Sequence, residues 1–337
     1  MNRSIRLAVL AIGAVVALVA VAAAFAAYTS PTLRVSYAGA VTNITASASP
    51  SDDATAVASI YVPAGTTITA NQVPGTQIGT VKAQVQAVAL GGALLPLDGK
   101  IIVAPPGAVT ADIQAACTQG ATPTAVWLLQ LAAAGQTINL PAYLIPTAGA
   151  ETALGPAKLV FCLAAPVVSA ANTFGAKFLS AALSITGVFG AVPEGAWVAF
   201  WTPWLADNSA PNPAGTVASP AAVAQGKVTV KAKKSGAGAL VTGVVTQGGQ
   251  PRPAAVVQIW GAKGKAKLRK LATVRTTAKG TFSYKAKSAD SFQAIATGAP
   301  IAAPPLCQLL TPQLNGIPCV NPTANGFTAK SGLAHKK

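Results

Sequence analysis

Short runs of alternating apolar and polar residues recur along the middle of the chain. Over residues 80–89, Val81, Ala83 and Val85 alternate with Lys82 and Gln84. This period of two is typical of a strand that buries one face, and turn residues separate most of the runs. Many short strands at such spacing predict an all-β chain of sandwich type rather than alternating strands and helices. In the first part of the chain, strands are predicted over residues 32–37, 54–62, 80–89, 100–103, 125–131, 137–140, 159–163 and 196–201.

One segment of this first part has a second interpretation. Residues 168–183 (VSAANTFGAKFLSAAL) also fit a single helix. Gly175 disfavours a helix interior, because glycine loses more backbone freedom there than other residues. The pattern alone leaves strand and helix open at this point.

A second series of apolar runs follows residue 226. Strands are predicted over residues 239–247, 253–260 and 271–277, and a turn then leads into residues 281–284. The run V-T-G-V-V-T-x-G-G-x-P, followed by A-x-V-x-I and L-A-T-V-x-T-x-A-x-G-T-F-S-Y, resembles the carboxypeptidase-regulatory-like, transthyretin-like or bacterial Ig-like sandwich modules of exported bacterial proteins. The resemblance covers residues 239–297. It implies a β-sandwich that serves as a spacer, a stabilising module or a binding surface and has no catalytic residues.

These patterns predict two β-sandwich domains, over residues 27–206 and 227–300. The intervening residues 207–226 (DNSAPNPAGTVASPAAVAQG) contain three prolines and no apolar periodicity, as expected of an extended Pro/Ala-rich linker. Residues 301–337 are a tail, in which residues 325–329 fit a returning edge strand and the last five residues are expected to be disordered.

The first 26 residues have the pattern of a secretory signal peptide, which is predicted as an N-terminal signal helix. Arg3 and Arg6 precede an apolar run, and Ala24 and Ala26 place small residues at the cleavage site. We therefore expect cleavage after Ala26 and a secreted or cell-envelope-associated protein. The alternative is an uncleaved membrane anchor, because residues 7–27 reach the roughly 20 residues that cross a bilayer.

The four cysteines fit an oxidising compartment. An even number in an exported chain suggests two disulfides. Pairing within each part of the chain favours Cys117–Cys162 and Cys307–Cys319. A zinc site is the alternative, but no pair has Cys-x2-4-Cys spacing and the single histidine, His335, lies in the tail. No metal or other cofactor is expected.

The charge is distributed very unevenly along the chain. The net charge of the whole chain is +16, yet residues 27–221 have five basic and seven acidic side chains. Residues 222–337 have seventeen basic side chains and the single acid Asp290, so this part alone carries +16. The contrast supports two separate modules.

A basic cluster follows Trp260 in the predicted hairpin loop. One interpretation is that its charges provide solubility and protect strand edges from aggregation. The other is that they attract anionic cell-envelope polymers or membrane head groups. Nucleic acid would also be attracted, but no recognisable binding motif accompanies the charges. The cluster consists of Lys263, Lys265, Lys267, Arg269 and Lys270.

Three tryptophans also suggest a binding role. A strand over residues 196–201 places Trp197 and Trp201 on the same face, and Trp204 follows directly. If these rings are exposed, they can stack on sugar rings, which gives a carbohydrate-binding or carbohydrate-active protein as the alternative function. If they are buried, they belong to the core.

Residues for catalysis are scarce. The chain has eight carboxylates and one histidine, whereas acid–base chemistry needs positioned titratable groups. The adjacent Asp52 and Asp53 are possible calcium ligands, but a solvated turn is expected because no further acids lie nearby in the sequence. The sequence therefore predicts a non-enzymatic structural or binding protein that is secreted or attached to the cell envelope.

Overall fold

The protein is built mainly of β-strands, which confirms the predicted all-β class. The computed structural model describes residues 28–29, 31–133, 135–170, 172–190, 195–222, 226–247, 250–299, 301–302, 316–320, 323–324 and 327–337. The predicted signal segment, residues 1–26, lies outside this range. Helices in the described part are short: α2 (Ala111–Thr118) and the 3-10 helices η1 (Val88–Leu90), η2 (Gly149–Ala153) and η3 (Pro213–Gly215). None of the helices in the described ranges is long and apolar enough to cross a membrane.

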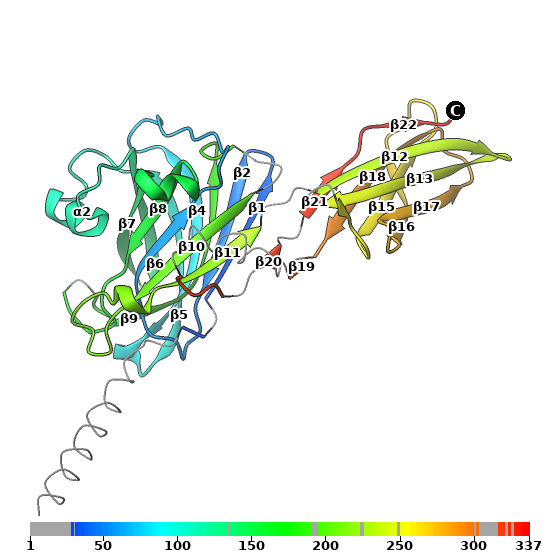
Figure 1. Cartoon of the computed structure of the whole chain (residues 1–337). Coiled ribbons are helices and arrows are strands. Elements are labelled where there is room, and N and C mark those ends of the chain that lie inside the picture. Colours follow the sequence, from blue (N-terminus) through cyan, green and yellow to red (C-terminus); the bar gives the residue numbers. More distant parts are fainter. Residues whose placement is uncertain are drawn as a thin grey trace, which may run out of the picture.

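The larger body of the protein is a single sheet of thirteen strands (Figure 1). From one edge to the other, its strands are β1 (Thr32–Ala38), β2 (Val41–Ser47), β9 (Ala176–Thr186), β4 (Gln77–Ala87), β5 (Ala93–Val103), β6 (Ala125–Ala133), β7 (Gln136–Pro146), β8 (Ala157–Cys162), β3 (Thr55–Tyr61), β10 (Ala196–Pro203), β11 (Val217–Ala222), β20 (Thr323–Ala324) and β19 (Ile301–Ala302). Neighbouring strands are antiparallel except for β11 and β20.

This sheet curls until β1 lies against β11, which makes a near-barrel (Figure 1). The sandwich predicted for residues 27–206 is therefore not confirmed. Alternation in a sequence shows only that one face of a strand is buried. It does not show whether a second sheet or the curl of the same sheet covers that face.

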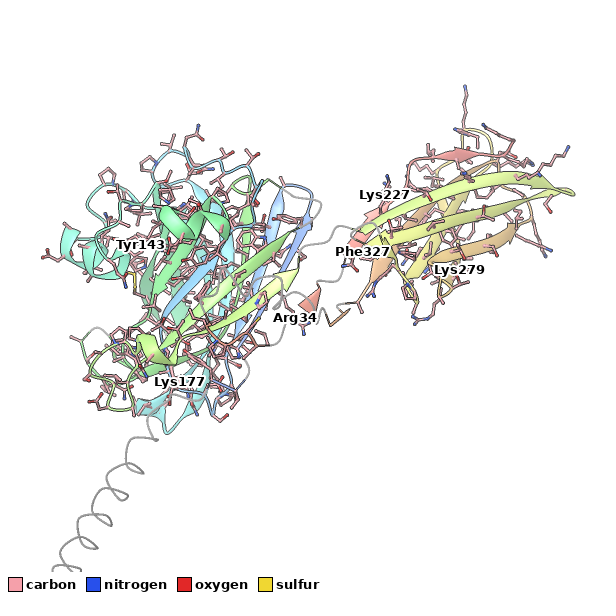
Figure 2. The ribbon with its side chains drawn as sticks, viewed as in Figure 1. Arg34, Tyr143, Lys177, Lys227, Lys279 and Phe327 are labelled. Carbon is pink, nitrogen blue, oxygen red and sulfur yellow. A yellow bond between two sulfur atoms is a disulfide. The ribbon has the colours of Figure 1, made fainter. Side chains whose placement is uncertain are left out.

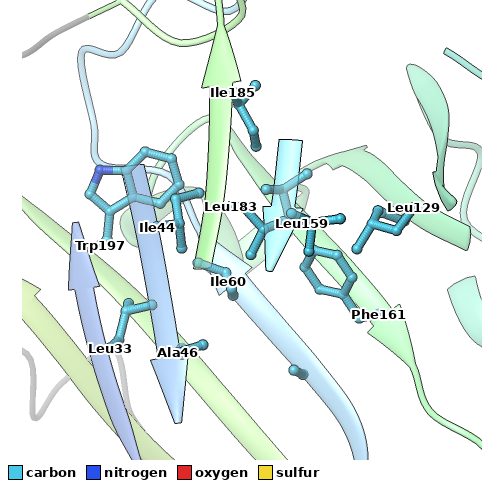
Figure 3. Packing of buried hydrophobic residues seen from close by; sticks show 14 of the residues in the cluster. Leu33, Ile44, Ala46, Ile60, Leu129, Leu159, Phe161, Leu183, Ile185 and Trp197 are labelled. Atoms are coloured by element: carbon cyan, nitrogen blue, oxygen red, sulfur yellow. The ribbon is translucent and has the colours of Figure 1, made fainter. Parts of the chain in front are cut away.

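The inner face of the large sheet forms its hydrophobic core (Figure 3). Leu33, Ile44 and Ile185 are fully buried there. The ring of Phe189 packs edge-on against Trp127 and Trp197, with centroid distances of 6.2 and 5.2 Å. The predicted apolar positions of the strands thus converge on one interior.

Two glycines on the inner face allow neighbouring strands to approach closely. A Cβ atom at Gly99 in β5 would lie 2.2 Å from the carbonyl oxygen of Gln130 in β6. A Cβ atom at Gly79 in β4 would lie 2.2 Å from the carbonyl oxygen of Ser184 in β9. Any side chain at these positions would push the backbones apart and oppose the curl.

Five strands of this sheet were not predicted, namely β2, β9, β11, β19 and β20, and one ambiguity is resolved. Residues 176–186 form β9, so the single helix considered for residues 168–183 is wrong. Strands β2 and β11 are rich in alanine, serine and threonine, which weakens their alternation. The helix α2 was also missed, although Thr110 caps it by accepting a hydrogen bond from the backbone N–H of Ile113 at 3.5 Å.

The disulfide predicted between Cys117 and Cys162 is present. It joins the end of α2 to the end of β8, with 5.8 Å between the two Cα atoms. Beside it lie the buried side chains of Tyr143, Ile145 and Val160, on the outer side of the sheet. The predicted partner of Cys319, Cys307, lies outside the described residues.

The smaller body contains two further sheets (Figure 1). The four-stranded sheet consists of β12 (Gly226–Ser235), β13 (Gly238–Gln247), β14 (Gln250–Pro251) and β17 (Thr281–Ala286). The five-stranded sheet consists of β16 (Arg269–Arg275), β15 (Val256–Ala262), β18 (Ser291–Gly298), β21 (Phe327–Lys330) and β22 (Ala334–His335). Apolar side chains of both sheets, among them Val241, Ile259 and Phe292, form one cluster separate from the core of the larger body.

The predicted linker and tail differ from their expected structure. Val217–Ala222 form β11, which pairs with β10, because its alanines and Val217 are apolar enough to extend the inner core. In the tail, Ile317 and Cys319 pack against the larger body, and the chain then returns as β21 at the edge of the five-stranded sheet. Ala334–His335, expected to be disordered, pair with β18.

Replacing Gly99 tests the tight approach of β5 and β6. We expect Gly99→Ala to lower the free energy of unfolding by about 1–3 kcal/mol, because the added methyl group meets rigid backbone atoms. The exposed neighbour provides the control, and Lys100→Ala should change stability by less than about 0.5 kcal/mol. Urea unfolding measures both values, and equal stability of the two variants would contradict the close packing.

Removing the disulfide tests its role in the fold. The Cys117→Ala/Cys162→Ala variant should lose about 2–4 kcal/mol of unfolding free energy, because the bridge closes a long loop with a sequence separation of 45 residues. Guanidinium unfolding monitored by tryptophan fluorescence measures the loss. An unchanged midpoint would show that the bridge adds nothing to stability.

Candidate functional site

The basic side chains of the smaller body lie on its surface. In β12, Lys227, Lys231 and Lys233 are exposed, whereas the alternate residues Val228 and Ala232 are buried. This is the arrangement expected from the alternation of a strand with one face in the core. Figure 2 shows Lys227 and Lys279 on this body.

The outer face of the four-stranded sheet is therefore polar and cationic. Lys233 in β12 lies beside Leu240 in β13, which in turn lies beside Lys285 in β17. Threonine and serine occupy most other outward positions, such as Thr242 and Ser283. No acidic side chain occurs in any of these three strands.

Several basic segments meet at one end of the smaller body, which we call the basic tip. The turn between β12 and β13, the loop between β15 and β16 and the residues after β17 all reach this end, as the strand registers show. The last residues join them, because the backbone N–H of Lys234 donates to the carbonyl oxygen of Lys337 at 2.9 Å. The basic tip consists of Lys233, Lys234, Lys263, Lys265, Lys267, Arg269, Lys270, Lys285, Lys287, Lys336 and Lys337.

A single carboxylate lies at the basic tip. Asp290 pairs with Lys336, with 3.2 Å between the Lys336 Nζ and a carboxylate oxygen. The hydrogen bond from Lys336 lowers the pKa of Asp290 below its usual value, and Lys263 adds a smaller effect of the same sign. This pair neutralises one cation, and the described tip keeps a large positive charge.

The sequence predicted part of the basic tip. Lys263, Lys265, Lys267, Arg269 and Lys270 are exposed, as expected of a loop and the start of a strand. The sequence did not show that the β12–β13 turn and the last residues join them. That proximity depends on strand pairing and on β22, which has only two residues.

The tryptophans that suggested sugar binding are not an exposed strip. Trp197 and Trp201 have no exposed surface, and both side chains point into the core. The Nε1–H of Trp197 donates to the Tyr37 hydroxyl at 3.1 Å, and that of Trp201 donates to Ser219 Oγ at 2.6 Å. Their polar atoms are thus satisfied within the protein.

Trp201 and Trp204 do border a cavity, however. A cavity of about 810 Å³ extends from the interior of the large sheet to α2 and the disulfide, since Ile113 and Cys117 also line it. Its lining is mainly alanine, valine, leucine and phenylalanine. Gln136, Thr137, Thr173 and Pro211 line it and are exposed, so the cavity opens to solvent at their end of the sheet. We call this opening the mouth.

The adjacent aspartates do not form the expected solvated turn, because Asp52 is buried. Its carboxylate accepts hydrogen bonds from the backbone N–H and hydroxyl of Thr29, at 2.7 and 2.6 Å, and from the backbone N–H of Ser49 at 2.9 Å. Nearby, the buried Tyr28 hydroxyl donates to Thr55 Oγ1 at 2.9 Å. Asp52 therefore fixes the start of the described chain to the sheet.

The other described carboxylates are dispersed over the surface. Glu151 accepts hydrogen bonds from the Tyr61 hydroxyl at 2.7 Å and from Lys158 Nζ at 2.6 Å. Burial raises the pKa of Tyr61 far above its usual value, and the Glu151 charge adds to the rise. Within the described ranges, no three histidine, cysteine, aspartate or glutamate side chains come together as metal ligands would. Glu194 lies outside those ranges.

Comparison with known proteins leaves the chain without an assigned family. No protein-family model matches the sequence, and no curated protein matches it. The likeness of residues 239–297 to carboxypeptidase-regulatory-like and Ig-like modules therefore stays a prediction from the sequence.

Proposed function

We propose that this is a non-enzymatic, secreted or cell-envelope-associated binding protein that attaches to anionic envelope material through its basic tip. The observation that carries the proposal is the separation of charge. Seventeen of the basic side chains and one acid occur after residue 221, and that acid pairs with Lys336. Such a surface attracts anions from a distance and holds them by many weak contacts.

The chemistry of the surface favours a phosphate- or carboxylate-bearing polymer over a lipid bilayer. Peripheral binding to a bilayer is strongest when apolar side chains enter the acyl region. On the outer face of the four-stranded sheet, the large apolar side chain with substantial exposure is Val244, at 37%. Lysine and hydroxyl groups around it suit a hydrated chain of negative charges.

Two further features support the proposal. The signal-peptide pattern of residues 1–26 would deliver the protein to the compartment in which such polymers occur. The described carboxylates take part in ion pairs or hydrogen bonds with their own chain, or lie singly on the surface, which favours binding over catalysis. For the carbohydrate alternative, the buried Trp197 and Trp201 offer no exposed stacking surface.

Neutralising the loop of the basic tip tests the proposal. The Lys263→Gln/Lys265→Gln/Lys267→Gln variant should bind poly(glycerol phosphate) roughly 100-fold more weakly, since each lysine near an anionic surface contributes about 1 kcal/mol. Binding of the parent protein should weaken from low to physiological ionic strength, because salt screens exposed charges. Calorimetry or retention on the immobilised polymer measures both effects.

A control variant with the same change in net charge distinguishes binding at a local site from attraction by the net charge of the whole protein. The Arg34→Gln/Lys82→Gln/Lys100→Gln variant removes three exposed cations from the larger body. It should retain most of the affinity. Equal losses in the two variants, or retention independent of salt, would overturn the proposed site. Tighter binding to phosphatidylglycerol vesicles than to the polymer would identify a membrane as the partner instead.

A further inference from the structure

The cavity of the large sheet has the dimensions of a binding site for a small molecule. Its volume of about 810 Å³ lies within the roughly 300–1,000 Å³ of typical ligand pockets. We propose that it binds an uncharged lipophilic molecule that carries a hydrogen-bond acceptor, such as an ester or a ketone. This site lies in the larger body and is independent of the basic tip.

A row of alanines creates the space. Ala46 in β2 pairs with Ala181 in β9, and Ala181 pairs with Ala83 in β4, so three neighbouring strands carry alanine at one level of the inner face. All three residues line the cavity. The next inward residues along these strands include Ile44, Leu183 and Val81, which fill the interior beyond the row. The cavity thus lies where the alanine side chains are too short to reach the side chains across the interior.

The wall opposite this row suits an apolar occupant. Leu129, Leu131 and Phe161 line it from β6 and β8. Phe178, from the same strand as Ala181, and Trp201 also line the cavity, and their rings are stacked at a centroid distance of 6.2 Å. Aromatic and aliphatic surfaces of this kind bind lipophilic groups through the hydrophobic effect.

The charge at the mouth disfavours an anionic head group. Lys177 is the charged side chain among the described lining residues. Its Nζ already donates to the carbonyl oxygens of Pro50, at 2.8 Å, and of Asp52. Burial lowers the pKa of Lys177, while the charges of Asp52 and Asp53 oppose that effect. The charges of Asp52 and Asp53 thus offset the attraction of Lys177 for an entering carboxylate, and the Lys177 ammonium is already bonded.

Two buried donors in the lining, the Nε1–H of Trp204 and the hydroxyl of Tyr143, make no hydrogen bond within the described part of the chain. The Nε1 atom of Trp204 is inaccessible to solvent. An unmade hydrogen bond of a buried group is costly, so an acceptor on a ligand would be favoured there. Of these two donors, Trp204 lies beside the mouth residue Pro211, so its N–H, rather than a charge, is the polar group that we assign to the ligand.

Competition with a fluorescent probe tests the site in the purified protein. N-phenyl-1-naphthylamine, which is uncharged and lipophilic, should bind with increased fluorescence, and methyl palmitate should displace it. Palmitate should displace it at least about tenfold less effectively, because burying an unpaired carboxylate is unfavourable. Equal displacement by ester and acid, or no binding of the probe, would overturn the proposal.

Two matched substitutions locate the binding. Ala181→Phe fills the cavity and should weaken probe binding at least about tenfold, whereas Ala182→Phe, on the exposed side of the same strand, should leave it unchanged. Equal binding by these two variants would place the probe elsewhere and refute the site.

Removing the Trp204 donor provides a second test that does not rely on filling the cavity. Trp204→Phe keeps an aromatic ring and removes the N–H group. It should weaken methyl palmitate binding by about three- to tenfold while leaving the probe, which needs no acceptor contact, unaffected. Unchanged ester binding in a folded variant, as judged by circular dichroism, would contradict the role of Trp204.

Discussion

The closure of one antiparallel sheet on itself determines most of this structure. A sheet with an apolar face must cover that face, and its edge strands expose unpaired backbone groups. Here the curl covers the apolar face and packs the edge strand β1 against β11. Gly79 and Gly99 let neighbouring strands approach closely, and the core forms from the inner face of every strand in the curl.

The curl of the sheet also fixes the width of its interior, and this width does not depend on which side chains face inward. The backbone sets the distance across the curl, and the inward residues either span that distance or leave space. Large side chains such as Trp127 and Trp197 fill the end at which they lie. The row of Ala46, Ala83 and Ala181 leaves space at the other end. The large side chains at one end of the strands thus contribute stability, and the alanines at the other end leave the space for a ligand.

The sequence allowed the class and most strands of the structure to be predicted, because alternation is a local property. It also paired Cys117 with Cys162 and identified the exposed basic cluster that follows Trp260. Closure was not predictable in this way, since it depends on contacts between β1 and β11, about 180 residues apart. The burial of Trp197 and Trp201 was considered, but the cavity beside Trp201 depends on alanines from distant strands. The basic tip was predicted only where its members are consecutive in the sequence.

The buried Asp52 has a geometric consequence for the whole molecule. It holds Thr29, and its own carbonyl oxygen is bonded by Lys177, which lines the cavity. The point at which the chain enters the larger body and the mouth therefore lie at the same end of the sheet. Any tether that precedes residue 28 would orient the opening toward the surface to which the tether is fixed.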